Sequence, residues 1–370
     1  HVSSEVSYTL VADVNGDGRI DVLDYHLIAV PGIYPDTAYR DPLAVFGPGL
    51  ASCDPRELGI YQYNSETGAY RPYDLGIADV APGQGYWVIT CRNRNLKIVG
   101  EPVYPSEPRS VQLPPGWSIV GFPYSIPMST DHLYVSSMET ATEPYPLSDN
   151  PWVENQAWAY NKGYIPIIGV GATSGDLHPW NAYWVYNSSL ETVNLIINPF
   201  LTVGPPVTKK TAATAAAGLS NASAVSGISF TVREKQKNYL DTTLFVGIQP
   251  ESSTKAERLS CMSPPPISSE VPRIFVDRRT SKDRPGKYAR EFQPLAQSGA
   301  VVFPVTLEVP VRKAARSYIL RWNLSNLPPG VKATLIGATR NPINMRKARS
   351  CTVVVPKDSK VRKMRVRLSR

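Results

Sequence analysis

The feature that most constrains this chain is that its apolar residues come in short runs broken by proline and glycine. The 370 residues include 35 Pro and 25 Gly, and long stretches with helical periodicity are nearly absent. Proline lacks a backbone donor and glycine lacks a Cβ, so both disfavour a long helix. Short apolar runs with frequent turn signals are typical of β-sandwiches and barrels. We therefore predict a mainly β chain built from tandem sandwich or barrel-like modules.

Length and charge both indicate several domains. A chain of 370 residues is expected to form two or three domains. Residues 205–226 contain no large aromatic residue and are rich in Ala, Thr and Ser, which predicts a linker. Residues 1–204 carry 9 Lys and Arg against 21 Asp and Glu, a net charge of −12. Residues 205–370 carry 30 against 10, a net charge of +20.

This division of charge has more than one interpretation. It is compatible with two surfaces that are charged for solubility alone. It also fits attraction between opposite ends of successive copies, or a basic end that binds an anionic surface. All three interpretations place the charge boundary at the linker.

The acidic part contains an internal repeat. Each copy has an aromatic-x-Tyr-Asn segment, a turn with glycine, an aromatic residue with proline, and then x-Tyr-Trp-Val. The two copies cover Ile60–Pro72 with Ala81–Thr90, and Ala157–Pro166 with His178–Asn187. The repeat predicts two β modules, over residues 41–110 and 111–204.

The aromatic residues of the repeat have two interpretations. Alternating aromatic side chains on strands commonly pack against one another in a core. The alternative is stacking on carbohydrate, which requires exposed rings. The residues concerned are Tyr86, Trp87, Trp180, Tyr183 and Trp184. Solvent exposure separates the two interpretations.

The stretch Asp13–Asp24, "DVNGDGRIDVLD", has the spacing of a twelve-residue calcium loop. Such a loop needs oxygen ligands at positions 1, 3, 5, 7, 9 and 12, with glycine at position 6. Gly18 fills the turn position. The predicted ligands are Asp13, Asn15, Asp17, the Arg19 carbonyl, Asp21 and Asp24. We predict that calcium neutralises this cluster of carboxylates.

Apolar residues after the loop predict a short helix over residues 22–30, ended by Pro31 and Gly32. Residues 11–31 resemble half of a type I dockerin, which implies a calcium loop heading a helix. The positions that hold a Ser/Thr pair for cohesin recognition are Val22 and Leu23 here, and no second loop follows. We therefore predict a structural calcium site over residues 1–40, inserted at the start of the first β module, with cohesin binding as the alternative.

The repeat resembles a β-rich repeat of large secreted bacterial proteins, over about residues 40–200. Its "GW" strand is present in the second copy, within Leu113–Tyr124. In the first copy this strand is expected before His1 or replaced by another strand. The resemblance implies an extracellular protein of several modules.

Residues 227–370 predict one immunoglobulin-like sandwich. The predicted strands cover 227–234, 242–249, 273–279, 301–309, 317–324, 332–338, 351–356 and 363–369. The segments Asp241–Gly247, Pro264–Pro266 and Leu320–Trp322 and the terminal "RVRL" are similar to immunoglobulin-like modules at the C-termini of bacterial surface-associated proteins. This resemblance implies a location at the cell surface.

Four cysteines and three Asn-x-Ser sequons are the candidate sites of modification. We predict disulfides that pair Cys53 with Cys91 and Cys261 with Cys351, with four reduced thiols as the alternative. The sequons are headed by Asn187, Asn221 and Asn323.

No motif for catalysis is recognised. The sequence lacks HExxH, GxSxG and P-loop patterns, and no run approaches the ~18 apolar residues of a membrane span. We predict a non-enzymatic extracellular structural protein, a surface or filament subunit that is stabilised by calcium and assembles head to tail or with other cell-surface proteins. Nucleic acid is not an expected partner. The alternatives are a carbohydrate- or cohesin-binding module, or a fragment of a larger secreted protein.

Overall fold

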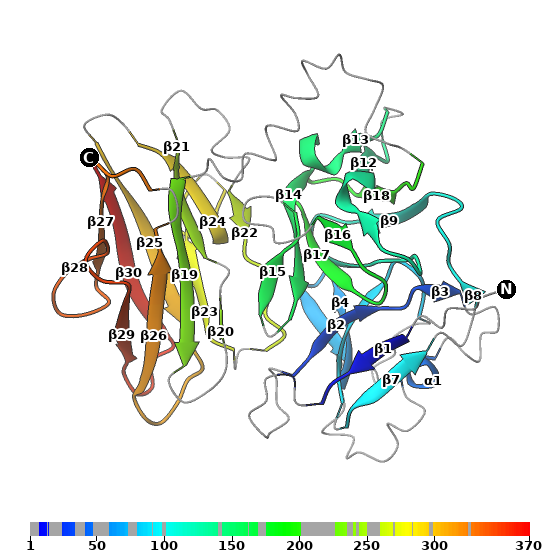
Figure 1. The fold of residues 1–370 in the computed structure, drawn as a ribbon, viewed down its shortest axis with the longest axis horizontal. Helices are drawn as coiled ribbons and strands as arrows, with labels where there is room; N and C mark the ends of the chain where they lie inside the picture. Colours follow the sequence, from blue (N-terminus) through cyan, green and yellow to red (C-terminus); the bar gives the residue numbers. More distant parts are fainter. Residues whose placement is uncertain are drawn as a thin grey trace. The chain divides into compact units, whose positions relative to one another are not determined.

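The structure is a computed structural model, and it confirms the mainly β prediction (Figure 1). It describes residues 7–12, 14, 24–33, 41–46, 59–72, 80–90, 92–97, 101–139, 143–161, 163–168, 175–200, 226–234, 240–241, 244–249, 260–268, 271–282, 284–295, 299–324 and 327–370. The chain divides into two compact units: unit 1 contains His1–Asn161 and Pro166–Thr214, and unit 2 contains Lys162–Ile165 and Ala215–Arg370. None of the helices in the described residues is long and apolar enough to cross a membrane.

Short strands are the main regular elements among the described residues before residue 200. They are β1 (Ser7–Leu10), β2 (His26–Ala29), β3 (Gly32–Ile33), β4 (Gly59–Asn64), β5 (Ala69–Pro72), β6 (Gly85–Ile89), β7 (Arg94–Lys97), β8 (Glu101–Pro102), β9 (Arg109–Leu113), β10 (Gly116–Gly121), β11 (Met128–Ser129), β12 (Leu133–Ser137), β13 (Tyr145–Pro146), β14 (Val153–Tyr160), β15 (Tyr164–Pro166), β16 (Asp176–Leu177), β17 (Ala182–Asn187) and β18 (Val193–Ile197). The helical elements are α1 (Pro42–Phe46) and the 3₁₀ turns η4 (Thr130–His132) and η5 (Leu147–Asp149).

The internal repeat corresponds to two copies of one strand arrangement. One sheet has the order β2-β6-β4-β5, and another has the order β10-β17-β14-β15. In the same way, β1 pairs with β7 and β9 pairs with β18. We call the copy from β1 to β7 repeat 1 and the copy from β9 to β18 repeat 2. Strand β2 occupies the place in repeat 1 that the "GW" strand β10 occupies in repeat 2.

The helix predicted over residues 22–30 is wrong for the part that the structure describes. Residues 26–29 form β2, which pairs with β6 in an antiparallel register. Leu27, Ile28 and Ala29 are all buried. A short apolar run buried on both faces has no period that separates a strand from a helix. The β-sheet partner, which lies about 60 residues later in the sequence, decides between them.

Unit 2 contains one large sheet. Its strands are β19 (Ser226–Glu234), β20 (Leu240–Asp241), β21 (Phe245–Gln249), β22 (Cys261–Met262), β23 (Arg273–Asp277), β24 (Lys287–Pro294), β25 (Ala300–Glu308), β26 (Arg316–Asn323), β27 (Lys332–Ile336), β28 (Ile343–Asn344), β29 (Ser350–Val355) and β30 (Val361–Ser369). The order is β28-β27-β30-β25-β23-β24-β21-β19-β26-β29, with β20 beside β19 and β22 beside β24.

The large sheet encloses a single core. Buried side chains from β19 at one side and from β30 at the other belong to the same apolar cluster, so the sheet curls around it. All eight strands predicted in this region are present, although their ends differ by a few residues. The prediction missed β24, whose neighbour β21 runs parallel to it, and the two-residue strands β20, β22 and β28.

Candidate functional site

The two repeats of unit 1 face each other through a reciprocal set of hydrogen bonds. The amide of Ala29 in repeat 1 donates to the carbonyl of Trp180 in repeat 2 over 2.8 Å. The amide of Gly121 in repeat 2 donates to the carbonyl of Gly83 in repeat 1 over 2.9 Å. Ala29 and Gly121 occupy equivalent positions in the two sheets, as do Gly83 and Trp180. The contact is therefore a two-fold one, like that of a symmetric dimer.

Small residues allow the close approach at the centre of this interface. A Cβ atom placed on Gly85 would lie 2.6 Å from the Cβ of its equivalent, Ala182. A Cβ atom placed on Gly121 would likewise lie 2.6 Å from the Cβ of Ala29. Both distances are far below an ordinary contact between carbon atoms. Each pair of equivalent positions thus holds one glycine and one alanine.

The tryptophans of the x-Tyr-Trp-Val motif cross the same interface. Trp87 of repeat 1 meets Tyr160 of repeat 2 edge to face, with ring centroids 4.7 Å apart. Trp184 of repeat 2 meets Tyr63 of repeat 1 in the same way, also at 4.7 Å. Edge-to-face pairs at this distance stabilise a core beyond the area they bury. The repeated motif therefore encodes the contact between the repeats.

Trp180 breaks the symmetry of the interface. Its φ of 66° is in the left-handed region, where its equivalent Gly83 has a φ of 87°. A large residue is rarely found there and is strained. Its side chain is 1% exposed, belongs to the apolar cluster of repeat 1, and lies 6.2 Å from the ring of Tyr8. Burial of the indole in the opposite repeat offsets the backbone strain.

The structure favours core packing for the aromatic residues and does not support sugar stacking. Each of the candidate rings is at most 4% exposed, so none offers a face to a ligand. These residues are Tyr86, Trp87, Trp180, Tyr183 and Trp184. The sequence identified them as important and left their partner open, because an aromatic strand pattern is the same in a core and in a binding platform.

The last residue of the predicted calcium loop contacts a residue near the start of the loop. Asp24, at position 12 of the loop, is completely buried, and its Oδ1 accepts a hydrogen bond from the amide of Val14 over 2.8 Å. His26, the first residue of β2, contacts the residue that follows β1. Its Nε2 lies 2.9 Å from the carbonyl oxygen of Val11. Burial lowers the pKa of His26. These contacts hold the two ends of the connection between β1 and β2 close together, as a loop that closes around an ion requires.

The other predicted ligands lie outside the described residues. They are Asp13, Asn15, Asp17, Arg19 and Asp21. The described part of the chain holds no group of three or more His, Cys, Asp or Glu side chains that suits a metal. The loop connects β1 to β2, whereas the equivalent connection in repeat 2, from β9 to β10, consists of Pro114 and Pro115 alone. The predicted calcium loop thus lies in a connection that is longer in repeat 1 than in repeat 2.

The predicted disulfide in unit 2 is not formed in the structure. Cys261 on β22 is opposite Arg290 on β24, whereas Cys351 on β29 is opposite Leu320 on β26. Four strands of the sheet separate β22 from β29. Burial raises the pKa of the Cys351 thiol to about 11. The predicted partners Cys53 and Cys91 lie outside the described residues.

The sequons occupy different environments. Asn187 is 1% exposed, and its Nδ2 donates to the carbonyls of Leu113 and Glu191 over 3.0 and 2.8 Å. The atom that would carry a glycan is therefore used inside repeat 2, which argues against modification of Asn187. Asn323 is exposed on β26, and Asn221 lies outside the described residues.

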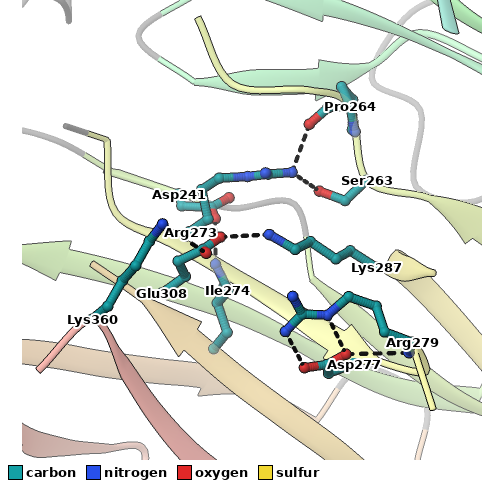
Figure 2. Close-up of polar contacts among 10 residues, drawn as sticks. All are labelled: Asp241, Ser263, Pro264, Arg273, Ile274, Asp277, Arg279, Lys287, Glu308 and Lys360. Carbon is teal, nitrogen blue, oxygen red and sulfur yellow. Dashed lines mark hydrogen bonds and ion pairs between the residues drawn. The ribbon is translucent and has the colours of Figure 1, made fainter. Parts of the chain in front are cut away.

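A cluster of ion pairs and hydrogen bonds lies on one face of the large sheet in unit 2 (Figure 2). Lys287 binds Glu308 over 2.7 Å and lies 4.8 Å from the ring centroid of Phe275, which is completely buried. Arg273 donates to Ser263 Oγ and to the carbonyl of Pro264, which holds the segment after β22 against the sheet. This cluster closes the sheet over a buried aromatic ring, so it has a structural role.

Glu308 is expected to stabilise unit 2 more than the neighbouring Glu291 does. Burial opposes ionisation of Glu308, but the hydrogen bond and charge of Lys287 outweigh it and lower the pKa of Glu308. Burial instead raises the pKa of Glu291, despite its ion pair with Arg278. Glu308→Gln should therefore cost about 1–2 kcal/mol of unfolding free energy at neutral pH. Glu291→Gln, the matched control, should cost less.

The pH dependence gives a second readout of the same pair. A carboxylate whose folded pKa is lowered stabilises the protein above its unfolded pKa and loses this effect as the pH falls through the folded value. The difference between wild type and Glu308→Gln in urea titrations should therefore shrink below about pH 4. Equal costs for the two variants at neutral pH would contradict this role for Glu308.

Comparison of the chain with protein families, with curated proteins and with solved structures finds no match.

Proposed function

We propose that the protein is a non-enzymatic extracellular structural protein, a surface or filament subunit whose copies assemble head to tail. The observation that carries the proposal is the division of charge, −12 for residues 1–204 and +20 for residues 205–370. The structure divides the chain into two compact units at residues 214 and 215, within ten residues of this charge boundary. Each copy therefore carries two folded bodies of opposite charge. Contacts between unlike surfaces generate open chains unless the rotation closes a ring.

The use of the aromatic residues supports a structural role over a binding role. The large aromatic side chains Trp87 and Trp184 pack in the contact between the repeats, and both are completely buried. In the polar cluster of Figure 2, Arg273 likewise holds the segment after β22 against the sheet. Both features stabilise the protein, which favours a structural role for these clusters.

Calcium is proposed as the ion of the loop at residues 13–24. Its support is the ligand spacing in the sequence together with the buried Asp24 carboxylate, which is tied to the amide of Val14. When bound, the ion would supply positive charge among four carboxylates of the loop and fix the connection between β1 and β2. Its role in this proposal is to stabilise unit 1.

Sedimentation velocity of the full chain with calcium tests the proposed assembly. At ~0.15 M salt, where charges are screened beyond about 8 Å, we expect species larger than a dimer that grow with protein concentration. At ~1 M salt the screening length falls to about 3 Å, and the species should shift toward the monomer. A protein that stays monomeric at high concentration and low salt is not a head-to-tail subunit.

A further inference from the structure

The last strand of unit 2 presents a column of cations on the outer face of the sheet. Lys363, Arg365 and Arg367 are exposed, and they alternate with the buried Met364, Val366 and Leu368. Residues two apart on a strand point to the same face at about 6.6–6.8 Å. The column therefore runs along β30, which lies between β27 and β25 inside the sheet.

No acid lies directly opposite the column on the neighbouring strands, and Glu308, on the same face of β25, is paired with Lys287 and Lys360. Across the strands, Arg365 is opposite Pro304 and Ile336, and Arg367 is opposite Val302 and Thr334. Lys363 is opposite Thr306 on β25. None of the three cations forms an ion pair in the part of the chain that the structure describes.

The sequence around the column is unusually basic. Residues 309–370 contain 16 Lys and Arg and a single acid, Asp358. Like charges aligned on a strand repel and are destabilising for the isolated sheet. Other cations of unit 2, such as Lys287, are paired with acids on the neighbouring strand. The column is thus a cluster of positive charge without an ion-pair partner among the described residues of unit 2.

Unit 1 carries the complementary charge on exposed side chains. Its exposed acids include Glu66, Glu101, Asp131, Glu139, Glu143 and Asp176. Exposed apolar side chains beside the column, such as Val302 at 45%, add area that association can bury. Charge pairs steer the encounter, and apolar contacts slow the dissociation.

We propose that the column Lys363, Arg365 and Arg367 on β30 docks the acidic surface of unit 1 of a second copy. This inference rests on the proposed head-to-tail assembly and names the surface that carries it. The contact is heterologous, because a basic face of one unit meets an acidic face of the other unit. It uses side chains on a sheet face, so it needs no free strand edge.

The test compares two variants of equal charge in the full chain. The column variant combines K363Q, R365Q and R367Q. The control variant combines K313Q, K347Q and K357Q, three exposed lysines in loops of unit 2. Both lower the net charge by three. Sedimentation velocity at ~0.15 M salt is measured for both and for wild type, and circular dichroism checks that each variant unfolds at the wild-type temperature.

We expect the column variant to associate about tenfold more weakly than wild type or worse, and the control variant to change by less than about threefold. Association of all three proteins to the same extent would overturn the inference and leave the proposed assembly standing. Equal weakening of both variants would overturn it too, because net charge alone would then explain the effect. A wild type that stays monomeric contradicts the proposed function itself. If that monomer binds heparin through the column, the partner is an anionic polymer and the inference is overturned.

Discussion

Trp184→Ala is expected to lower the unfolding free energy of unit 1 by about 3–5 kcal/mol, the usual cost of removing a large buried aromatic side chain. The indole is completely buried and meets Tyr63 of the opposite repeat at 4.7 Å. Removal of the ring leaves a cavity at the interface and exposes part of both repeats to water. Urea unfolding followed by circular dichroism measures the change.

The two-fold arrangement sharpens this prediction. Trp87→Ala removes the equivalent ring and its contact with Tyr160, so its cost should match that of Trp184→Ala within about 1 kcal/mol. Tyr145→Ala is the control, because that ring is 43% exposed and its loss should cost little. A neutral effect of Trp184→Ala would show that the repeats do not depend on this contact.

Removal of calcium is expected to destabilise unit 1 by about 2.7 kcal/mol relative to protein that contains calcium at about one hundred times its Kd. The physical reason is that the ion binds a folded loop and not the unfolded chain. Thermal unfolding after treatment with a chelator, and again after calcium is restored, measures the shift. Calorimetry of the chelated protein should show one site.

A pair of variants assigns this effect to the loop. Asp17→Ala removes the predicted ligand at position 5 and should abolish the response to calcium. Asp131→Ala removes an exposed acid elsewhere in unit 1 and should leave the response unchanged. The calcium hypothesis fails if the chelated wild type neither releases heat nor gains stability on addition of the ion.

The repeat and most strands could be predicted because their pattern is local. Alternating apolar residues indicate β30, and the x-Tyr-Trp-Val motif marks β6 and β17. Strand β24 was missed because it contains Arg290 and Glu291, which are charged but buried at 5% and 1% exposure. A charged residue inside a fold depends on neighbours that are distant in sequence, and the pattern of one strand does not reveal them.

The site could be predicted only in part for the same reason. The sequence singled out Trp180 without indicating that it enters the core of repeat 1. No local signal shows that Trp180 takes a positive φ, which only its equivalence to Gly83 in repeat 1 indicates. In the same way, the alternation of residues in β30 does not reveal that β25 and β27 lie on its two sides.

The reciprocal contact between the repeats makes unit 1 a dimer whose halves are covalently tethered. Two separate halves would part on dilution, whereas tethered halves keep a fixed effective concentration. Because the two repeats belong to one chain, their sequences can also differ from each other. A true homodimer would carry the predicted calcium loop twice, but here the connection after β1 holds Asp24, whereas the matching connection after β9 is only Pro114 and Pro115. If the loop binds calcium, unit 1 holds one ion, in repeat 1 alone. The ion would then distinguish the two otherwise equivalent ends of unit 1.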